Sequence, residues 1–225
     1  MKGSKGRESK SRRAERSALI LHILKKRYPD AKCELSFSSP EELLIATILS
    51  AQSTDRTVNS VTPELFSRFP VPAGLAKAKL SEIEGIIRPC GYYRQKARSI
   101  RETATALFER YNGTVPPRME DLLTLRGVAR KTANVVLSVA FGINEGVAVD
   151  THVARLSVRL GLSTSLRPDL IEKDLMASVA RNEWGNFTTL LIAHGRSVCN
   201  ARKPHCSRCG ISTLCPSAFR LASWS

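Results

Sequence analysis

Four of the six cysteines in this chain lie within seventeen residues near the C-terminus, where they could surround one metal centre. Gaps of six, two and five residues separate them, and the four are Cys199, Cys206, Cys209 and Cys215. Thiolates crowded in this way bind soft metal centres. A reducing compartment makes disulfides a poor explanation. Zinc sites more often use two close pairs separated by a longer loop, yet the spacing alone leaves zinc and an iron–sulfur cluster equally open.

The loop between the first two of these cysteines is basic and has the sequence NARKPH. We expect Arg202 and Lys203 to contact a phosphate backbone from this metal-bound loop, and the simpler alternative is a solvated surface loop. The other two cysteines, Cys33 and Cys90, are isolated in the sequence. We expect both to be buried as small apolar residues.

Lys131 stands where a helix is predicted to begin, in the segment LRGVARKTANVV. Gly127 permits the positive φ of a tight hairpin, and the helix that starts near Arg130 offers free N–H groups to an anion such as a DNA phosphate. As a surface cation, Lys131 would contact that phosphate. However, the positive end of the helix dipole and partial burial beside the following apolar run would both favour a neutral, nucleophilic amine.

Asp150, in the segment AVDTH, is the carboxylate that could assist such an amine. A helix over residues 131–141 carries the chain about 16 Å away at 1.5 Å per residue. An extended segment over residues 145–150 returns it by roughly 16–20 Å at about 3.3 Å per residue. The simpler role of Asp150 is the N-cap of the next helix. A capping carboxylate is rigidly placed, so one residue can hold both roles.

Helix signals dominate the rest of the chain, and the sequence predicts an all-α fold. Ser39 and Pro40 mark one helix start. A long amphipathic helix is expected from Tyr93 to a stop at Gly113. The helix over residues 131–141 is apolar nearly all round, which predicts a central, buried element.

Three local expectations concern helix boundaries and strands. Pro63 should lie at a break in its helical segment or at the start of a new helix. Ser81 and Glu84 have the spacing of a capping box at the start of a short helix. Residues 146–150 are the best candidate for a strand, although alternating patterns are scarce.

The charge balance points to a polyanionic partner. The chain of 225 residues has 35 Lys and Arg against 20 Asp and Glu, a net charge of +15. Residues 1–17 contribute seven basic and two acidic residues, so the remaining chain still carries +10. Nucleic acid is the usual partner for such a surplus, and an anionic membrane surface is the competing one. We expect residues 1–17 to form a disordered basic tail.

The apolar segment ALILHIL follows this basic stretch but is short, contains His22 and is not followed by a small-residue cleavage site. A secretion signal is therefore not expected, and no run approaches the roughly 18 apolar residues of a membrane span. We expect a cytoplasmic, nucleoid-associated protein that does not bind membranes.

Taken together, the motifs LRGVARKTANVVL, VDTHV and the 6-2-5 cysteine spacing resemble the endonuclease III family of helix-hairpin-helix DNA glycosylases and abasic-site lyases. The segments LLIATILSAQSTD and HGRSVCNARKPHC resemble the same family, and the likeness covers about residues 18–217. The resemblance implies a [4Fe–4S] cluster on the four cysteines. It also implies a monomer that acts on double-stranded DNA containing damaged bases or abasic sites.

The resemblance further implies two helical domains flanking a DNA-binding cleft. The first is a six-helix domain with the helix-hairpin-helix, here residues 33–143. The second is the cluster domain, which joins residues 18–32 to residues 144–217. A C-terminal tail over residues 218–225 would follow.

The same resemblance implies a role for individual residues. Lys131 matches the Schiff-base lysine and Asp150 the catalytic aspartate. Gln52 matches the residue that fills the gap left by an extruded nucleotide, and Tyr92 falls where an apolar wedge is usual. The implied reaction removes oxidised pyrimidines and nicks the strand by β-elimination. Related adenine-mismatch glycosylases lack a lysine at the position of Lys131.

Two departures from the family hairpin, Leu-Pro-Gly-Val-Gly, stand in this sequence. Arg126 replaces the proline and adds a cation. Ala129 replaces the second glycine, and because alanine adopts positive φ less easily, we expect a strained or reshaped hairpin. Other hypotheses remain open at this point: the same scaffold acting on another lesion such as alkylated purines, a weakly catalytic iron–sulfur damage sensor, or a zinc-type regulatory DNA binder.

Overall fold

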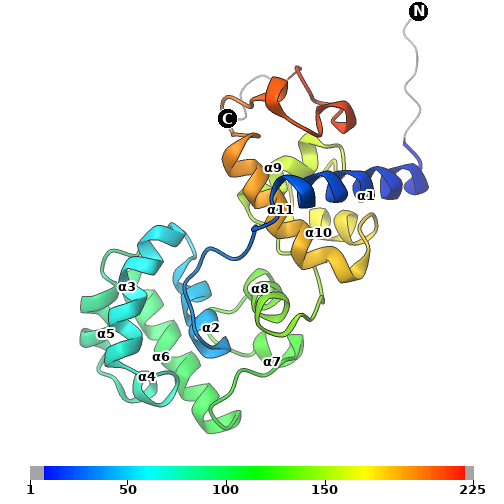
Figure 1. Cartoon of the computed structure of the whole chain (residues 1–225). Coiled ribbons are helices and arrows are strands. Elements are labelled where there is room, and N and C mark those ends of the chain that lie inside the picture. The colour runs from blue at the N-terminus through cyan, green and yellow to red at the C-terminus, as the bar shows by residue number, and fades with distance from the viewer. Residues whose placement is uncertain (1–7, 221–225) are drawn as a thin grey trace, which may run out of the picture. The chain divides into compact units, whose positions relative to one another are not determined.

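The computed structural model describes residues 8–220, and these residues form helices and turns with no strand among them (Figure 1). The predicted all-α fold is confirmed. The chain divides into two compact units, which are described separately: one is Cys33–Glu145, and the other joins Met1–Lys32 to Gly146–Ser225. Within residues 8–220, no helix is both long and apolar enough to cross a membrane.

The unit Cys33–Glu145 is built around one fully buried helix. Seven consecutive residues of α2, from Leu43 to Leu49, are buried, because this helix is apolar on every side. It packs against α3, α6 and α8. The helices of the unit are α2 (Pro40–Leu49), α3 (Asp55–Arg68), α4 (Ala73–Lys77), α5 (Leu80–Ile87), α6 (Tyr93–Arg110), α7 (Met119–Leu122) and α8 (Arg130–Phe141).

The other unit packs its N-terminal helix against helices from the second half of the chain. Helix α1 lies against α11, and α9 contacts both α11 and α10 (Figure 1). Ile20 and Leu24 of α1 share an apolar core with Leu156 and Phe187. The elements are α1 (Lys10–Arg27), α9 (Thr151–Arg159), α10 (Pro168–Met176) and α11 (Trp184–Ser197), with short 3-10 turns η1 (Arg181–Glu183), η2 (Cys206–Arg208) and η3 (Ser212–Leu214).

The prediction of a disordered tail is wrong for residues 8–17, the part of this segment that the structure describes. Helix α1 already begins at Lys10, with Ser9 as its N-cap. The Arg16 guanidinium donates to both carboxylate oxygens of Glu8, at 2.8 and 2.7 Å, and to the carbonyl of Leu160 at 2.6 Å. These contacts anchor the first turns of α1. Residues 1–7 of the expected tail, and residues 221–225 at the other end, lie outside the described residues.

Three local expectations are also corrected. Helix α3 continues through Pro63, which lies on the exposed face where the unpaired carbonyl four residues earlier can meet water. Helix α5 begins at Leu80, and Glu82 rather than Glu84 accepts a hydrogen bond from the backbone of the N-cap Lys79. Residues 146–150 form no strand.

The helix over residues 131–141 is not buried all round as expected. Helix α8 buries one face, through Ala133, Asn134, Val136 and Leu137. Val139 on another face is 38% exposed. Helix α2 holds the central position instead, because it is the helix that lacks a polar side along its length.

Candidate active site and metal centre

The hairpin between α7 and α8 is held by close contact with α6 and α2. Gly127 has φ +79°, and a Cβ at this position would lie 3.0 Å from the Ser99 Cβ and 3.3 Å from the Ile48 Cγ2. Two features therefore require glycine at this position: the positive φ of the backbone and the lack of room for a side chain. The predicted positive φ at Gly127 is confirmed.

Ala129 does not strain this hairpin, so that expectation is wrong. It is the N-cap of α8 with φ −93° and ψ 170°, an extended conformation that any residue adopts. The rigidity that a proline would give comes instead from Arg126. Its carbonyl accepts a hydrogen bond from the Thr103 hydroxyl at 2.8 Å, and its guanidinium pairs with Glu102 at 3.0 Å.

The hairpin presents backbone N–H groups to an anion. Within residues 8–220, neither the Gly127 N–H nor the Ala129 N–H has a hydrogen-bond acceptor. Both residues are exposed, and the N-terminus of α8 follows directly. Arg130 adds an exposed guanidinium, which donates to the carbonyl of Glu145 at 3.3 Å. This arrangement suits a phosphate group.

Lys131 is the second residue of α8 and is exposed. The expected partial burial is wrong, because α8 turns its buried face away from this residue. No described residue forms an ion pair or hydrogen bond with the Lys131 amine. The side chain therefore projects from the first turn of α8, next to the N–H groups of the hairpin, and is open to a ligand.

Asp150 caps α9, as predicted. Its carboxylate accepts a hydrogen bond from the backbone N–H of Val153 at 2.7 Å, and the residue is half-buried. The cap fixes one carboxylate oxygen and leaves acceptor capacity on the other. In the same turn, His152 is half-buried, and burial lowers the pKa of its imidazole while the nearby Asp150 carboxylate raises it.

Gln52 and Tyr92 are both exposed and both have left-handed backbone. Gln52 has φ 51° and Tyr92 has φ 57°. Tyr92 is 67% exposed and is the N-cap of α6. A tyrosine in this conformation is unusual, and such strain gathers at functional sites when the surrounding structure enforces it.

The four clustered cysteines line a single small cavity. Cys199, Cys206, Cys209 and Cys215 surround it together with apolar residues and the side chains of Arg159 and His194. Among the described residues, no three or more of the ligand-type side chains converge on a single ion. The four thiols nonetheless share one cavity, which is the arrangement that a thiolate-bound metal centre requires.

The surroundings of these thiols are both apolar and hydrogen-bonded. Burial raises the pKa of the Cys209 and Cys215 thiols. The Nε2 atom of the buried His194 lies 3.4 Å from the Cys209 sulfur, and burial lowers the pKa of this histidine to about 4. The thiols therefore lie in mostly apolar surroundings, with one imidazole nitrogen within hydrogen-bonding distance of a sulfur.

Two buried arginines of α9 fix the loop that carries the first cysteine. Arg159, which is 1% exposed, donates to the carbonyls of Asn200 and Ala201 at 2.7 and 2.6 Å and to the Cys199 sulfur at 3.3 Å. Arg155 donates to the carbonyls of Gly195 and Cys199, both at 3.0 Å. Sequence reasoning overlooked both residues, although charged residues four apart on an otherwise apolar helical stripe were a visible signal.

Arg202 and Lys203 lie on the loop between Cys199 and Cys206, and both are exposed. No described residue pairs with either side chain. As for the isolated cysteines, Cys90 is buried as expected, whereas Cys33 is only partly buried.

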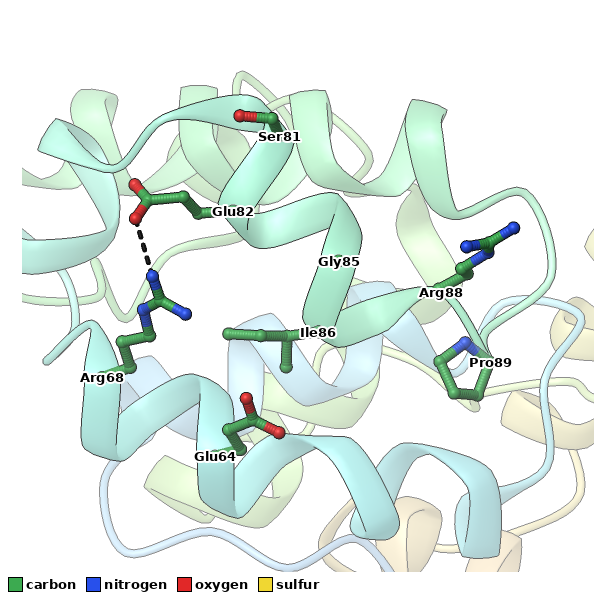
Figure 2. A pocket seen from close by; sticks show the side chains of 8 residues that line it. All are labelled: Glu64, Arg68, Ser81, Glu82, Gly85, Ile86, Arg88 and Pro89. Carbon is green, nitrogen blue, oxygen red and sulfur yellow. Dashed lines mark hydrogen bonds and ion pairs between the residues drawn. The ribbon is translucent and has the colours of Figure 1, made fainter.

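A hollow between α3 and α5 is lined by none of the residues of this site. Its two sides are joined by an ion pair between Arg68 and Glu82, at 2.7 Å (Figure 2). Gly85 lines the same hollow, and a Cβ added there would meet no atom within 4 Å.

Known proteins agree with this arrangement of motifs. The family model of the HhH-GPD superfamily of base excision DNA repair proteins matches residues 45–181. The endonuclease III of Synechocystis is 54% identical over 91% of this chain and 93% of its own length. The endonuclease III of Escherichia coli K12 is 41% identical over 87% of this chain and 92% of its own length.

A solved structure of a trapped covalent intermediate between endonuclease III and DNA has a TM-score of 0.84 and 43% identity, and it covers 91% of this chain and 96% of that one. A non-covalent endonuclease III–DNA complex has the same TM-score, at 42% identity. The chain belongs to the endonuclease III family of the HhH-GPD superfamily, and it is a base excision repair DNA glycosylase for oxidised pyrimidines with abasic-site lyase activity.

Proposed function

We propose that Lys131 is the nucleophile of this glycosylase and lyase. The observation that carries the proposal is an exposed amine without a partner among the described residues, placed one turn from two unpaired N–H groups that suit a phosphate. A backbone phosphate held there would bring a sugar within reach of the amine. A relative in the family has been trapped as a covalent intermediate with DNA, which supports a nucleophilic side chain.

The steps follow from the chemistry of an amine. The nitrogen of Lys131 forms a bond to C1′ of the damaged nucleotide, and the glycosidic bond breaks as the base leaves with the bonding electrons. The lysine nitrogen then loses a proton and its lone pair opens the sugar ring, so that the C1′–O4′ bond breaks and O4′ takes up a proton. The Schiff base formed in this way acidifies the neighbouring C2′ proton, whose loss breaks the C3′–O bond and nicks the strand. Asp150 assists, either by accepting a proton from Lys131 or by stabilising the positive charge that develops on the sugar.

We assign the DNA contacts to three parts of the chain. Gly127, Ala129 and Arg130 hold a phosphate at the hairpin. Gln52 and Tyr92 enter the duplex when the damaged nucleotide is extruded. The third part is the exposed loop with Arg202 and Lys203, which contacts the phosphate backbone.

The cavity lined by Cys199, Cys206, Cys209 and Cys215 would hold a [4Fe–4S] cluster. The donor set supports it, since four thiols share one cavity whose remaining lining is mostly apolar. The cluster would cross-link the C-terminal loop to the helices around it, so that the basic residues between Cys199 and Cys206 are rigidly presented. A brown protein with absorbance near 400 nm supports this assignment, and a colourless zinc protein contradicts it.

Borohydride trapping tests the proposed nucleophile. Duplex DNA with one oxidised pyrimidine, and separately with one abasic site, is mixed with the protein and reduced, and a covalent adduct is sought. We expect an adduct on both substrates that is lost in Lys131→Ala and kept in Lys173→Ala, which removes another exposed lysine. An adduct that persists in Lys131→Ala would exclude this residue as the nucleophile.

The same experiment separates the competing functions. An adduct on abasic DNA alone would indicate a lyase whose base removal is directed at another lesion. Tight binding without any adduct would leave Lys131 as a phosphate contact and indicate a damage sensor. To test whether Lys131 and Asp150 serve one reaction, the single and double variants are compared: residues that act together lose less in combination than the product of their separate losses.

A further inference from the structure

The loops that carry Gln52 and Tyr92 are joined by one hydroxyl group. The Ser53 Oγ accepts a hydrogen bond from the backbone N–H of Gly91 at 3.2 Å. It also accepts one from the ammonium group of Lys96 at 2.8 Å. Ser53 follows Gln52 in the chain, and Gly91 precedes Tyr92. One side chain therefore links the loops of two exposed residues that both have left-handed backbone.

The two loops also touch along their backbones. A Cβ on Gly91 would lie 3.2 Å from the carbonyl oxygen of Gln52, closer than most Cβ contacts. Glycine at this position lets the loops approach each other. A larger residue would push Gln52 away from Tyr92 even if the hydrogen bonds to Ser53 remained.

Lys96 is placed unusually for a lysine. It lies in the first turns of α6, is only 6% exposed, and has no carboxylate partner among the described residues. Burial lowers its pKa, and the neighbouring Cys90 thiol acts in the opposite direction. A buried amine that is bonded to a hydroxyl rather than to a carboxylate costs stability, so a function other than stability is indicated for it.

We propose that Lys96 is a positioning residue that acts through Ser53 to hold the Gln52 loop and the Tyr92 loop in one fixed arrangement for entry into the duplex. This inference rests on the proposed function, which assigns Gln52 and Tyr92 to that step. Both residues are in a strained conformation, and strain of this kind persists only where the surroundings enforce it. Lys96 and Ser53 supply that enforcement from inside the unit.

The consequence is a difference between the two substrates of the enzyme. Removing a damaged base requires the nucleotide to leave the stack, and preformed wedges reduce the cost of that step. An abasic site has no base to extrude, so its cleavage depends less on the two loops. Loss of the link should therefore reduce base excision far more than abasic-site cleavage.

The test uses Lys96→Met, which keeps most of the side-chain length and removes the donor, and Ser53→Ala, which removes the acceptor. We expect single-turnover excision of an oxidised pyrimidine to fall by about tenfold to a hundredfold, the loss typical of small misplacements in an active site. Abasic-site cleavage should stay within about threefold under the same conditions. A 2-aminopurine next to the lesion should report less unstacking on binding than with the unaltered protein.

Two comparisons separate positioning from simple instability. Lys79→Met removes an exposed lysine of the same unit and should change neither activity. Ser53→Thr keeps the hydroxyl and should retain most of the excision rate. The double variant Lys96→Met with Ser53→Ala should be no slower in excision than the slower single variant, because both substitutions break the same link.

The outcomes are distinguishable from a failure of the proposed function. If Gln52→Ala and Tyr92→Ala excise bases at the normal rate, the assigned duplex role fails and this inference fails with it. If those two variants are slow while Lys96→Met and Ser53→Ala are not, the link alone is wrong. Parallel loss of excision and abasic-site cleavage in Lys96→Met would also overturn the inference, since that is the behaviour of a residue needed only for folding.

Discussion

Gly195 is a helical glycine whose missing side chain leaves room for two side chains of α9, the half-buried His152 and the buried Arg155. A Cβ at this position would lie 2.9 Å from the Nδ1 of His152, 3.0 Å from the Nη2 of Arg155 and 3.2 Å from the His152 Cβ. A Cβ atom in a folded protein essentially never lies closer than 3.0 Å to such a neighbour, so the neighbouring atoms would have to shift. Gly195→Ala must therefore displace His152, Arg155 or both.

The magnitude follows from what these groups do. Forcing a methyl group into a packed interior costs about 1–3 kcal/mol. Arg155 donates to the carbonyls of Gly195 and Cys199, and weakening such a bond from a buried charge costs about 1.5–3 kcal/mol. Alanine regains about 1 kcal/mol of helix propensity over glycine. We expect Gly195→Ala to lower the free energy of unfolding by about 2–4 kcal/mol.

Urea unfolding followed by circular dichroism measures this change, and Gly85→Ala is the matched control. Gly85 is also helical, but a Cβ there would meet nothing within 4 Å, because the residue faces the open hollow between α3 and α5 (Figure 2). Gly85→Ala should therefore raise the free energy of unfolding by up to about 1 kcal/mol. The same substitution is expected to have opposite signs at the two sites.

The result that would refute this reasoning is a Gly195→Ala protein as stable as the unaltered one. It would mean that α11 and α9 separate freely at this contact and that the hydrogen bonds of Arg155 do not depend on their spacing. A midpoint shift with an unchanged dependence on urea would confirm that native stability, and not the unfolded state, has changed.

Three further predictions concern the Asp150 cap, the backbone of Ala129 and the ion pair of Glu8. Asp150→Asn keeps the helix cap, so its free energy of unfolding should stay within about 0.5 kcal/mol of that of the unaltered protein while its activity is lost. Asp150→Ala removes the cap as well and should also lower the free energy of unfolding by about 1 kcal/mol. Urea unfolding and glycosylase assays measure these two effects. Ala129→Gly should not improve DNA affinity in a binding titration and should cost up to about 1 kcal/mol, because Ala129 already has an ordinary φ. The hydrogen bond from Arg16 lowers the pKa of Glu8, so this contact stabilises the protein above the usual carboxyl pKa and is lost as pH falls through the lowered one. Unfolding of Glu8→Gln and of the unaltered protein should therefore differ by no more than about 1 kcal/mol near neutral pH and converge in acid.

Features governed by neighbouring residues in the chain could be predicted from the sequence. The Asp150 cap, the Ser39 cap and the positive φ of Gly127 each depend on a few consecutive residues, and each is confirmed. Features governed by tertiary packing could not. Helix α8 has an apolar pattern nearly all round, but only the packed unit decides which apolar helix is central, and α2 takes that place. The exposure of Lys131 follows from the same fact, since it depends on which face of α8 is covered.

Lys96 shows where a pattern could have predicted more than it did. Counting back along α6 from the buried residues Ile100, Ala104 and Leu107 places Lys96 on the same inward stripe, four residues before Ile100. A lysine on such a stripe either extends its amine to the surface or keeps it inside with a polar partner. The sequence cannot choose between these, because the partner, Ser53, lies 43 residues earlier in the chain and is brought close only by the packing of the unit. A charged residue on an apolar stripe therefore predicts that a partner exists, and the fold is needed to identify it.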